Sequence, residues 1–423
     1  MTEQTVSKVP KIRFKGFQGE WDEKALGDLF SITSAARVHK NEWTNLGVPF
    51  FRSSDVVSHF KGNENTKAFI SHELYEELSA KVGRIKKGDM LVTGGGSIGI
   101  PYLVKTDEPL YFKDADLLWF KIREAVDSNY LYTFLTSEPF RRFLRSTSHI
   151  GTIAHYTVEQ AKSTPLRLPK TAPEQTQIGG YFQALDSLIG LHQRKHDKLV
   201  TLKKAMLQKM FPQAGATTPE IRFKGFEGEW VEKKLGDLTE TGFTNGVFND
   251  PSKVGRGYRL INVKDMFSGI GIDVDNLSLV DLDENEFKKN KVQYGDIFFT
   301  RSSLVKEGIA CSNVNLSAHQ DITFDGHLIR MQPCRKITDS IFLSYAFMTA
   351  SSRRQFILGG KTTTMTTIGQ SDIAVVEVAL PTKTEQIQIG TYFRQLDALI
   401  SKHTIQLQKL KQLKSACLEK MFV

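Results

Sequence analysis

The stretch Ile12–Trp21 has the sequence IRFKGFQGEW, and Ile221–Trp230 has the sequence IRFKGFEGEW. Nine of these ten residues are identical, and Leu-Gly-Asp-Leu follows each copy after four intervening residues. A second pair of blocks, Glu174–Ile189 (EQTQIGGYFQALDSLI) and Glu385–Ile400 (EQIQIGTYFRQLDALI), shares eleven of sixteen residues. The two pairs recur in the same order at spacings of 209 and 211 positions, so the chain is an internal duplication.

The regions between the repeated blocks diverge and share only a skeleton. Gly88-Asp89 corresponds to Gly295-Asp296, and each aspartate begins a strand-like run, DMLVT in the first copy and DIFFT in the second. A helical pattern over residues 130–145 follows in the first copy. We predict an α+β fold with two mixed α/β domains and two helical segments. The predicted boundaries are 1–165, 166–212, 213–380 and 381–423.

Each closing block continues into a long helical pattern that ends on Lys-Met-Phe, and Pro212 stops the first one. Apolar or neutral side chains recur every three or four residues for about four heptads, which is typical of a coiled-coil seam. The predicted seam consists of Ile178, Phe182, Leu185, Ile189, His192, Leu199, Leu202, Ile389, Phe393, Leu396, Ile400, His403, Leu407 and Leu410.

Two packing arrangements would bury this seam. Each helix could cover its own domain, or the two helices could pack on each other. Because the helices are similar, long and apolar on one face, we favour an antiparallel coiled coil that relates the two halves by a pseudo-two-fold axis. The pair would then act as a spacer that both joins and separates the two domains.

The composition is that of a globular protein, with 40% hydrophobic and 24% charged residues in 423. No apolar run approaches the roughly 20 residues of a membrane helix, and the first residues lack the apolar core of a secretory signal. Cys311, Cys334 and Cys417 suit neither a disulfide framework nor a metal knuckle. We therefore expect a reduced, cytoplasmic protein.

The net charge of +9 is concentrated in the helical segments, because 166–212 carries +5 and 381–423 carries +4. Lysines on the solvated face of a helix pair explain this surplus, and so does a helix face that lies near DNA phosphates. The two domains carry almost no net charge, so binding of DNA by them would need local clusters and hydrogen-bond recognition.

Motifs of enzymes are weak or missing. The segment 94–99 reads GGGSIG, which matches GxGxxG and GxSxG, but an extended run follows where either motif needs a helix. The corresponding segment of the second copy, TRSSLVKEG at 300–308, has lost the glycines. The chain has no Walker A sequence, no Asn/Asp-Pro-Pro-aromatic motif of adenine methylation and no HExxH pair. We expect a glycine-rich turn at 94–99, and no catalytic residue and no bound metal.

Polar and basic clusters remain at three matching places in the two copies. Arg, Asn, Ser and Thr side chains in such loops can bond to base edges or phosphates, although polar loops often only face water. The candidate DNA-binding residues are Arg52, Ser53, Ser54, Thr93, Gly95, Ser97, Thr152 and His155 in the first copy, and Asn262, Lys264, Thr300, Arg301, Ser302, Lys306, Lys361, Thr363 and Thr364 in the second.

This organisation resembles the specificity subunit (HsdS) of type I restriction–modification systems over essentially the whole chain. The resemblance is carried by the duplicated GFxGEW segments, by the two Leu-Pro…Glu-Gln-x-x-Ile segments that begin at Leu168 and Leu380, and by the long heptad helices. We find no serious departure from the family pattern.

The resemblance implies a DNA-binding, non-catalytic subunit of a DNA methylation and restriction complex. Two target recognition domains would each recognise one half of a bipartite, asymmetric target in double-stranded DNA, and the helices would set the gap. Two methyltransferase subunits and two restriction subunits would bind the chain. S-adenosylmethionine, ATP and Mg²⁺ would act through those subunits, and none of them would bind this chain.

Two other functions stay open from the residues alone. A non-enzymatic coiled-coil scaffold has no need for two dissimilar sets of polar loops, which argues against it. A self-contained DNA methyltransferase or nuclease lacks the motifs described above. Salt-dependent binding to duplex DNA separates the favoured function from the scaffold, and methyl transfer by the chain alone would indicate the enzyme.

Overall fold

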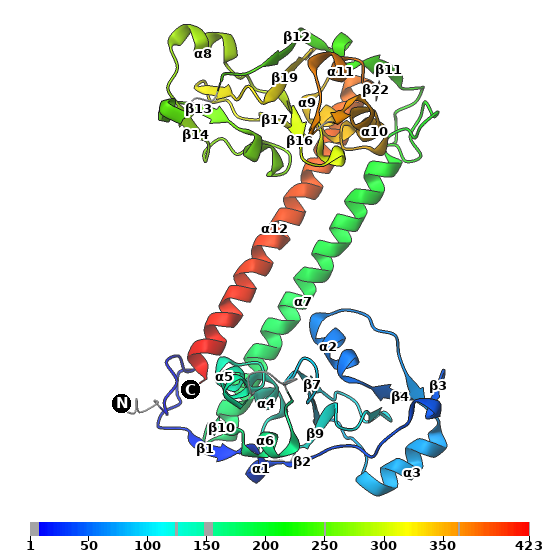
Figure 1. The fold of residues 1–423 in the computed structure, drawn as a ribbon, viewed down its shortest axis with the longest axis vertical. Helices are drawn as coiled ribbons and strands as arrows, with labels where there is room; N and C mark the ends of the chain where they lie inside the picture. Colours follow the sequence, from blue (N-terminus) through cyan, green and yellow to red (C-terminus); the bar gives the residue numbers. More distant parts are fainter. Residues whose placement is uncertain (1–7, 123–125, 148–154, 249–250, 363, 423) are drawn as a thin grey trace. The chain divides into compact units, whose positions relative to one another are not determined.

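The computed structural model describes residues 8–122, 126–147, 155–248, 251–362 and 364–422. The chain forms two compact units (Figure 1), a first unit of Met1–Gln193 with Ile405–Val423 and a second unit of Arg194–Thr404. The long helices α7 (Ala172–Lys209) and α12 (Lys383–Met421) each contribute one part to the first unit and one part to the second. These units cut across the predicted segments 166–212 and 381–423, because each long helix packs on both.

The described residues of the first unit form three small sheets. β1 (Asp22–Ala25) pairs with β10 (Pro165–Leu168), and the main sheet has the order β2 (Ser31–Thr33), β9 (Leu117–Lys121), β6 (Met90–Thr93), β7 (Pro101–Leu103). The third has the order β3 (Trp43–Thr44), β5 (Phe69–Ile70), β4 (Val48–Phe51), β8 (Tyr111–Phe112). The helices are α1 (Leu26–Leu29), α2 (Ser53–Lys61), α3 (His72–Val82), α4 (Ser128–Phe134), α5 (Glu138–Thr147) and α6 (Val158–Ser163), with the 3-10 turn η1 (Lys40–Glu42).

The second unit repeats this plan. β11 (Val231–Lys234) pairs with β22 (Glu377–Leu380), and the main sheet has the order β12 (Thr239–Asn245), β19 (Leu328–Pro333), β15 (Ile297–Thr300), β17 (Ser312–Val314). Two further sheets have the orders β14 (Ser278–Val280), β13 (Val254–Ile261), β18 (Ile322–Phe324) and β16 (Ser302–Ser303), β21 (Thr366–Thr367), β20 (Lys361–Thr362). The helices are α8 (Glu284–Asn290), α9 (Ser340–Ala346), α10 (Ala350–Gly359) and α11 (Gln370–Ala374), with turns η2 (Leu235–Leu238), η3 (Pro251–Lys253), η4 (Val263–Phe267) and η5 (Lys306–Gly308).

The predicted α+β class and the internal duplication are therefore confirmed. The two strand-like runs after the Gly-Asp pairs are β6 and β15, each the third strand of its main sheet. Gly88 and Gly295 have φ of +95° and +84°, a conformation that glycine adopts without strain. The helical pattern at 130–145 is two helices, α4 and α5.

The predicted glycine-rich turn at 94–99 is also confirmed. The extended strand β7 follows it, and no helix begins there. Gly96 and Gly99 both have φ of +71°, and a Cβ on Gly99 would lie 2.3 Å from Leu144 Cδ1. The two glycines therefore allow a tight turn that packs on α5. A phosphate-binding loop or a nucleophile elbow would instead lead directly into a helix.

The end of each long helix closes the core of one unit. Phe422, just after α12, lies against Trp21 and Phe182 in the first unit. Phe211, just after α7, lies against Trp230 and Phe393 in the second. The repeated Lys-Met-Phe therefore anchors each helix end through aromatic contacts.

The two long helices run antiparallel within each unit. In the first unit, Lys414 Nζ donates to Asp186 Oδ1 at 2.6 Å and the Tyr181 hydroxyl lies 3.6 Å from Cys417 Sγ. In the second, Lys203 Nζ donates to Asp397 Oδ1 at 2.6 Å. The two lysine–aspartate pairs are symmetry equivalents, since both partners are displaced by 211 residues, which confirms the predicted pseudo-two-fold pairing.

One predicted seam residue is wrong. Leu202 is exposed, at 38%, whereas Lys203 is half-buried in its place and ion-paired to Asp397. A spacing of three and four residues is compatible with either position in the seam. Lys203 occupies it because its ammonium group pairs with the carboxylate on the facing helix.

The seam near the start of each helix also packs on its own domain. Ile178, Phe182 and Leu185 belong to the first core, and Ile389, Phe393 and Leu396 belong to the second. The two packing arrangements therefore occur together.

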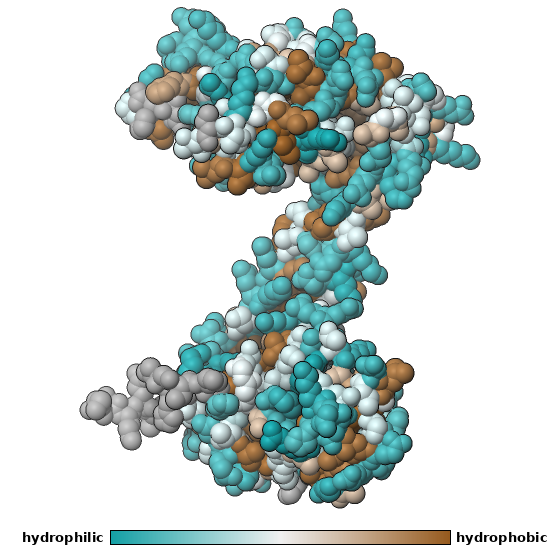
Figure 2. Space-filling view, turned by 45° about the vertical axis from the view of Figure 1, so that its right-hand side comes forward, coloured by the Kyte–Doolittle hydropathy of each residue, from teal (hydrophilic) through white to brown (hydrophobic). Residues whose placement is uncertain are grey.

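Hydrophilic side chains cover most of the exposed face in Figure 2, with apolar residues in scattered patches. In the part of the chain that the structure describes, none of the helices is both long enough and apolar enough to cross a membrane.

Candidate nucleic-acid interface

The repeated blocks form a frame around one buried ion pair in each unit. Arg13 Nε and Nη2 donate to the two carboxylate oxygens of Glu174 at 2.7 and 2.8 Å. Arg222 bonds in the same way to Glu385, again at 2.7 and 2.8 Å. The carboxylates are 2% and 0% exposed, and hydrogen bonding to Glu385 raises the pKa of Arg222. The arginine of IRFKGF thus ties the entry of each unit to the start of a long helix.

The glutamine after each glutamate ties the same helix to the variable region. Gln175 accepts a hydrogen bond from Asp127 N at 3.1 Å and donates to Pro169 O at 3.2 Å. Gln386 accepts from Asp339 N at 2.9 Å and donates to Pro381 O at 3.0 Å. Asp127 and Asp339 are the N-caps of α4 and α9. Through these bonds the frame holds the backbone of each variable region, and apolar side chains of the frame also pack in one core with apolar side chains of that region.

In the first unit, the three predicted polar clusters meet at the backbone of Asp116. Its carbonyl accepts from Ser53 Oγ and from Gly94 N, both at 2.8 Å. Tyr156 N, directly after His155, donates to Gly94 O at 2.8 Å. These bonds join the start of α2, the glycine-rich turn and the segment before α6.

The second unit repeats this junction with different side chains. Arg301 N donates to His327 O at 3.0 Å, and Ile368 N donates to Arg301 O at 3.0 Å. The strand β16 pairs with β21, so the predicted clusters at 300–306 and 361–367 form one small antiparallel ribbon. Asp325 N donates to Ile261 O at 3.0 Å and connects the cluster at Asn262.

A half-buried arginine supports the turn in each unit. Arg353 donates to the carbonyl oxygens of Glu307, Ile309 and Ala310 at 2.9, 2.6 and 3.1 Å, and burial lowers its pKa. Its counterpart Arg141 donates to Ile98 O at 3.5 Å. The paired arginines of the sequence skeleton therefore hold loop backbone, and the first arginine of each pair is turned inward.

The exposed candidate residues are Ser54, Ser97 and His155 in the first unit and Lys264, Arg301, Lys306, Lys361 and Thr364 in the second. Arg52, Ser53, Gly95, Asn262 and Ser302 are half-buried. Thr152 and Thr363 lie outside the described residues. These exposed groups are donors and acceptors of the kind that bond to phosphates and base edges. Whether any of them contacts DNA stays a prediction.

Thr93 and Thr300 are corrections, because their side chains are 0% and 1% exposed. Thr93 Oγ1 accepts from Ile100 N at 2.8 Å and donates to Ser97 O. Thr300 Oγ1 accepts from Cys311 N at 2.9 Å. Each hydroxyl closes its own loop, and neither can reach a ligand. The predicted DNA contacts at these two positions are therefore wrong.

Arg52 forms an ion pair with Asp55 inside its own unit. Its guanidinium donates to both carboxylate oxygens of Asp55 at 2.8 and 3.0 Å, and this bonding raises the pKa of Arg52. Asp55 Oδ2 also accepts from Arg52 N at 2.8 Å, and Asp265 accepts in the same way from Asn262 N at 2.9 Å. The matching aspartates therefore fix the two loops, and a DNA contact by Arg52 would have to break its ion pair.

Two polar residues at this junction were missed by the sequence analysis. His327 has a 67% exposed side chain, and its Nδ1 lies 2.8 Å from Asp325 Oδ1. Lys113 is ion-paired to Asp116 at 2.7 Å in the first unit. Each lies just before a strand of the main sheet, β19 or β9. Nothing in the local sequence marks them, and only the sheet order brings them beside the predicted loops.

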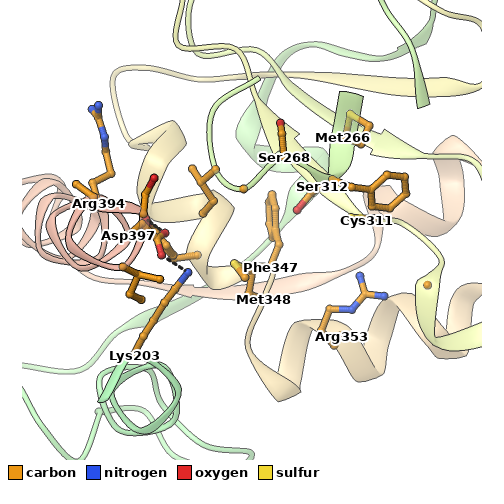
Figure 3. Close-up of a pocket in the computed structure, with 18 of the residues that line it drawn as sticks. Lys203, Met266, Ser268, Cys311, Ser312, Phe347, Met348, Arg353, Arg394 and Asp397 are labelled. Carbon is orange, nitrogen blue, oxygen red and sulfur yellow. Dashed lines mark hydrogen bonds and ion pairs between the residues drawn. The ribbon is translucent and has the colours of Figure 1, made fainter. Parts of the chain in front are cut away.

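A cavity of about 820 Å³ lies in the second unit, between the loop at Met266–Ile270, the end of α9 and the second unit's part of α12 (Figure 3). Lys203 points to Asp397 at its edge, and Tyr345 Oη donates to the other carboxylate oxygen of Asp397 at 2.8 Å.

On the far side of the cavity, burial raises the pKa of the Cys311 thiol, which favours its protonated form. Among the described residues, no group of three His, Cys, Asp or Glu side chains could hold a metal ion.

We expect Asp296→Asn to change the pH dependence of stability of the second unit. Asp296 is buried beside Arg330, and burial raises the pKa of its carboxyl from 3.8 to about 6. Because the folded chain binds this proton more tightly than the unfolded chain, ionisation costs the wild type stability as the pH rises from about 4 to 6. The free energy of unfolding of the variant relative to the wild type should rise by about 2 kcal/mol over that interval.

Hydrogen exchange of β15 and β19 at pH 4 and pH 7 measures this difference for the second unit alone. Exchange in β6 and β9 of the first unit serves as the internal control and should not change. A stability difference that stays flat between the two pH values would show that burial does not govern this carboxyl.

Comparison with known proteins gives one consistent result. The family model described as type I restriction modification DNA specificity domain matches residues 18–201 and 227–412. A putative type I restriction enzyme specificity subunit of Haemophilus influenzae is 32% identical over 111 residues, which are 26% of this chain and 27% of that protein. The EcoKI specificity subunit of Escherichia coli K12 is 24% identical over 284 residues, 65% of this chain and 60% of that protein.

The chain thus matches less than two thirds of the length of either relative. Among solved structures, the type I restriction-modification S subunit from M. genitalium superposes with a TM-score of 0.62, covering 98% of this chain and 99% of that one. At 14% sequence identity, this likeness concerns the fold.

Proposed function

We propose, because the chain belongs to the family of type I restriction–modification DNA specificity domains, that it binds double-stranded DNA and supplies the target specificity of a methylation and restriction complex. Each unit would recognise one half of a bipartite, asymmetric target. The chain would contribute no catalytic group of its own. Its location in the cytoplasm, where such DNA is found, is part of the proposal.

One observation carries this proposal. Two nearly identical frames hold two dissimilar sets of polar loops at the same structural junction. Gly94 in the first unit makes the same backbone bonds as Arg301 in the second. A scaffold would need only the frames. Recognition of two unlike half-sites requires unlike side chains on a common support, because base edges are distinguished by the donors and acceptors that face them.

The partners follow from the family and remain part of the proposal. Two methyltransferase subunits and, in the full complex, two restriction subunits would bind this chain. S-adenosylmethionine, ATP and Mg²⁺ would be used by those subunits. A methyltransferase reaches a base inside a duplex only by flipping it out, and a chain that grips the flanking sequence would position that step.

A methylome tests the proposal. The chain is expressed with its candidate methyltransferase partner in a host free of DNA methylation, and single-molecule sequencing locates N6-methyladenine. We expect one bipartite motif with a fixed gap, which disappears when this chain is omitted. A stable complex that methylates no motif, or methylates it equally without this chain, would contradict the proposal. Failure of the two proteins to associate would favour a scaffold for other partners.

Arg301→Ala should weaken recognition of one half-site only. The side chain is exposed at the junction of the second unit, with its backbone held at both ends by the bonds to His327 and Ile368. If it pairs with a base edge, its loss costs about 1–3 kcal/mol of binding free energy at that half-site. Binding titrations on duplexes altered in one half-site at a time measure the effect. Equal loss on every duplex, with a smaller salt dependence, would make Arg301 a phosphate contact instead.

A further inference from the structure

The most exposed large apolar side chains of the second unit include one at the tip of the loop after β15. Leu304 is 86% exposed and its neighbour Val305 is 60% exposed. A single exposed leucine needs no explanation, so the argument depends on how this one is held and on what surrounds it.

The register of the ribbon places a second apolar residue beside this tip. The ladder of β16 and β21 pairs Ser303 with Thr366, so the next residues in this register are Leu304 and Met365. Met365 is 39% exposed. The ribbon therefore ends in a small apolar edge, which we call the apolar tip and which consists of Leu304, Val305 and Met365.

The apolar tip has a rigid base. Arg353 holds three carbonyl groups at 307–310 from below. Ser303 Oγ accepts from Val305 N at 3.3 Å, and Gly308 N donates to Val305 O at 3.1 Å. A Cβ on Gly308 would lie 2.5 Å from Ser303 Oγ, so the two sides of the loop are in close contact. A loop held in this way loses little conformational entropy when it binds a partner.

Exposed cations lie on the loop of the apolar tip and on the same ribbon. Arg301 and Lys306 belong to the loop, and Lys361, which is ion-paired to Asp372 at 3.8 Å, begins β20 with a 79% exposed side chain. Glu307 is the one acidic residue of 301–308. Apolar side chains between flanking cations suit a polyanion with an apolar interior, which describes the stacked bases of duplex DNA between two phosphate chains.

We propose that Leu304 inserts between adjacent base pairs of the DNA half-site bound by the second unit, as a wedge that unstacks one step. This inference depends on the proposed function. The first unit has Gly95, Gly96 and Ser97 at the equivalent turn, so it has no such side chain. The wedge would therefore deform only one of the two half-sites. Because base-pair steps differ in how easily they unstack, the protein would prefer a flexible step at that position.

The test uses the complex of the full chain with its methyltransferase partner and the duplex that the methylome identifies. Leu304→Ala is compared with Leu358→Ala, which removes an equally apolar side chain that is 71% exposed on α10 of the same unit. We expect Leu304→Ala to weaken binding about tenfold and leave the salt dependence unchanged, because no charge is lost. Leu358→Ala should bind as the wild type does, and Leu304→Met should restore most of the affinity.

Duplexes with 2-aminopurine at successive positions locate the wedge. We expect the wild type to raise the fluorescence at one step of the second half-site, and Leu304→Ala to abolish that signal while keeping the one at the flipped adenine. Equal behaviour of Leu304→Ala and Leu358→Ala would overturn the wedge and leave the proposed function intact. So would loss of the methyltransferase from the Leu304→Ala complex with unchanged DNA signals, since the tip would then be a protein contact. Absence of sequence-dependent binding by the wild type would overturn both proposals.

Discussion

Replacing Arg222 with Met is expected to lower the free energy of unfolding of the second unit by about 3–5 kcal/mol. Arg222 satisfies both oxygens of Glu385, whose side chain is 0% exposed. Removal of the guanidinium leaves a buried carboxylate with no counter-charge, and that desolvation cost is larger than the net worth of the intact pair. Trp230 packs on Phe342 and its backbone N donates to Thr217 O at 2.8 Å, so the entry segment stays in place without the guanidinium.

Hydrogen exchange resolves the effect by unit. Protection in β15 and β19 should fall in Arg222→Met, while protection in β6 and β9 should stay as in the wild type. Arg13→Met should give the opposite pattern, because Arg13 makes the same pair with Glu174 in the first unit. Lys288→Met breaks an exposed pair with Glu284, so it serves as the matched control and should cost under about 1 kcal/mol.

The double variant Arg222→Met/Glu385→Met separates the two causes. An apolar pair of similar volume should recover most of the lost stability, because no charge then remains buried. A double variant as unstable as the single one would show that the pair stabilises the unit through its geometry, and that the buried charge is a minor part of the cost.

A graft within the chain is expected to replace one half-site completely. Residues 239–367 are exchanged for residues 30–155 of the same chain, so that both units carry the variable region of the first. If each variable region recognises its own half-site, the methylated motif should contain the first half-site twice and no longer contain the second. Each frame would remain, because its glutamines bond to the backbone of the variable region and the core side chains that face the frame are mostly apolar in both copies.

The boundaries of the graft follow from the contacts. The first junction of each segment falls just after a Leu-Gly-Asp-Leu turn and the second falls just before α6 or α11, so α1 stays paired with α6 and η2 with α11. Ile368 is kept, because the hydroxyl of its counterpart Tyr156 lies 2.7 Å from Thr164 Oγ1 and the second frame offers Val376 at that place. Asp397 loses its bond from Tyr345 but keeps the one from Lys203.

The reciprocal graft, 239–367 in place of 30–155, is the matched control and should give the second half-site twice. Methylomes of the two grafts and the wild type measure all three motifs. If either graft still methylates the wild-type motif, the variable regions do not determine the target, and recognition would have to come from the frames or the helices.

Much of the fold could be predicted because the same sequence pattern occurs at matching positions in both copies, so each copy supports the interpretation of the other. The matched glycine–aspartate pairs located β6 and β15, and the heptad pattern located α7 and α12. The periodicity failed at Leu202, where Lys203 occupies the seam. A hydrophobic pattern cannot show which of two adjacent positions faces a carboxylate on the other helix, since that depends on the register between them.

The candidate site was predictable only as a set of loops. Arg301, Lys306 and Lys361 are exposed as expected, whereas Thr93 and Thr300 are used inside their own loops. A threonine after a strand has the same local sequence whether its hydroxyl faces solvent or closes a turn. His327 was missed because it joins the other loops through the order of the sheet, and strand order is not a local property.

The sequence by itself determined the duplication, the repeated frames and the long helices, because these depend on identity between copies and on local periodicity. Only the tertiary structure decided which loops meet, which arginines brace them from below and which apolar side chains stand free at the tip. These outcomes depend on contacts between residues far apart in the sequence, such as Ser53 with Asp116 and Arg301 with Ile368, which are 63 and 67 positions apart. Such contacts form when the sheets assemble, and no short stretch of sequence encodes them.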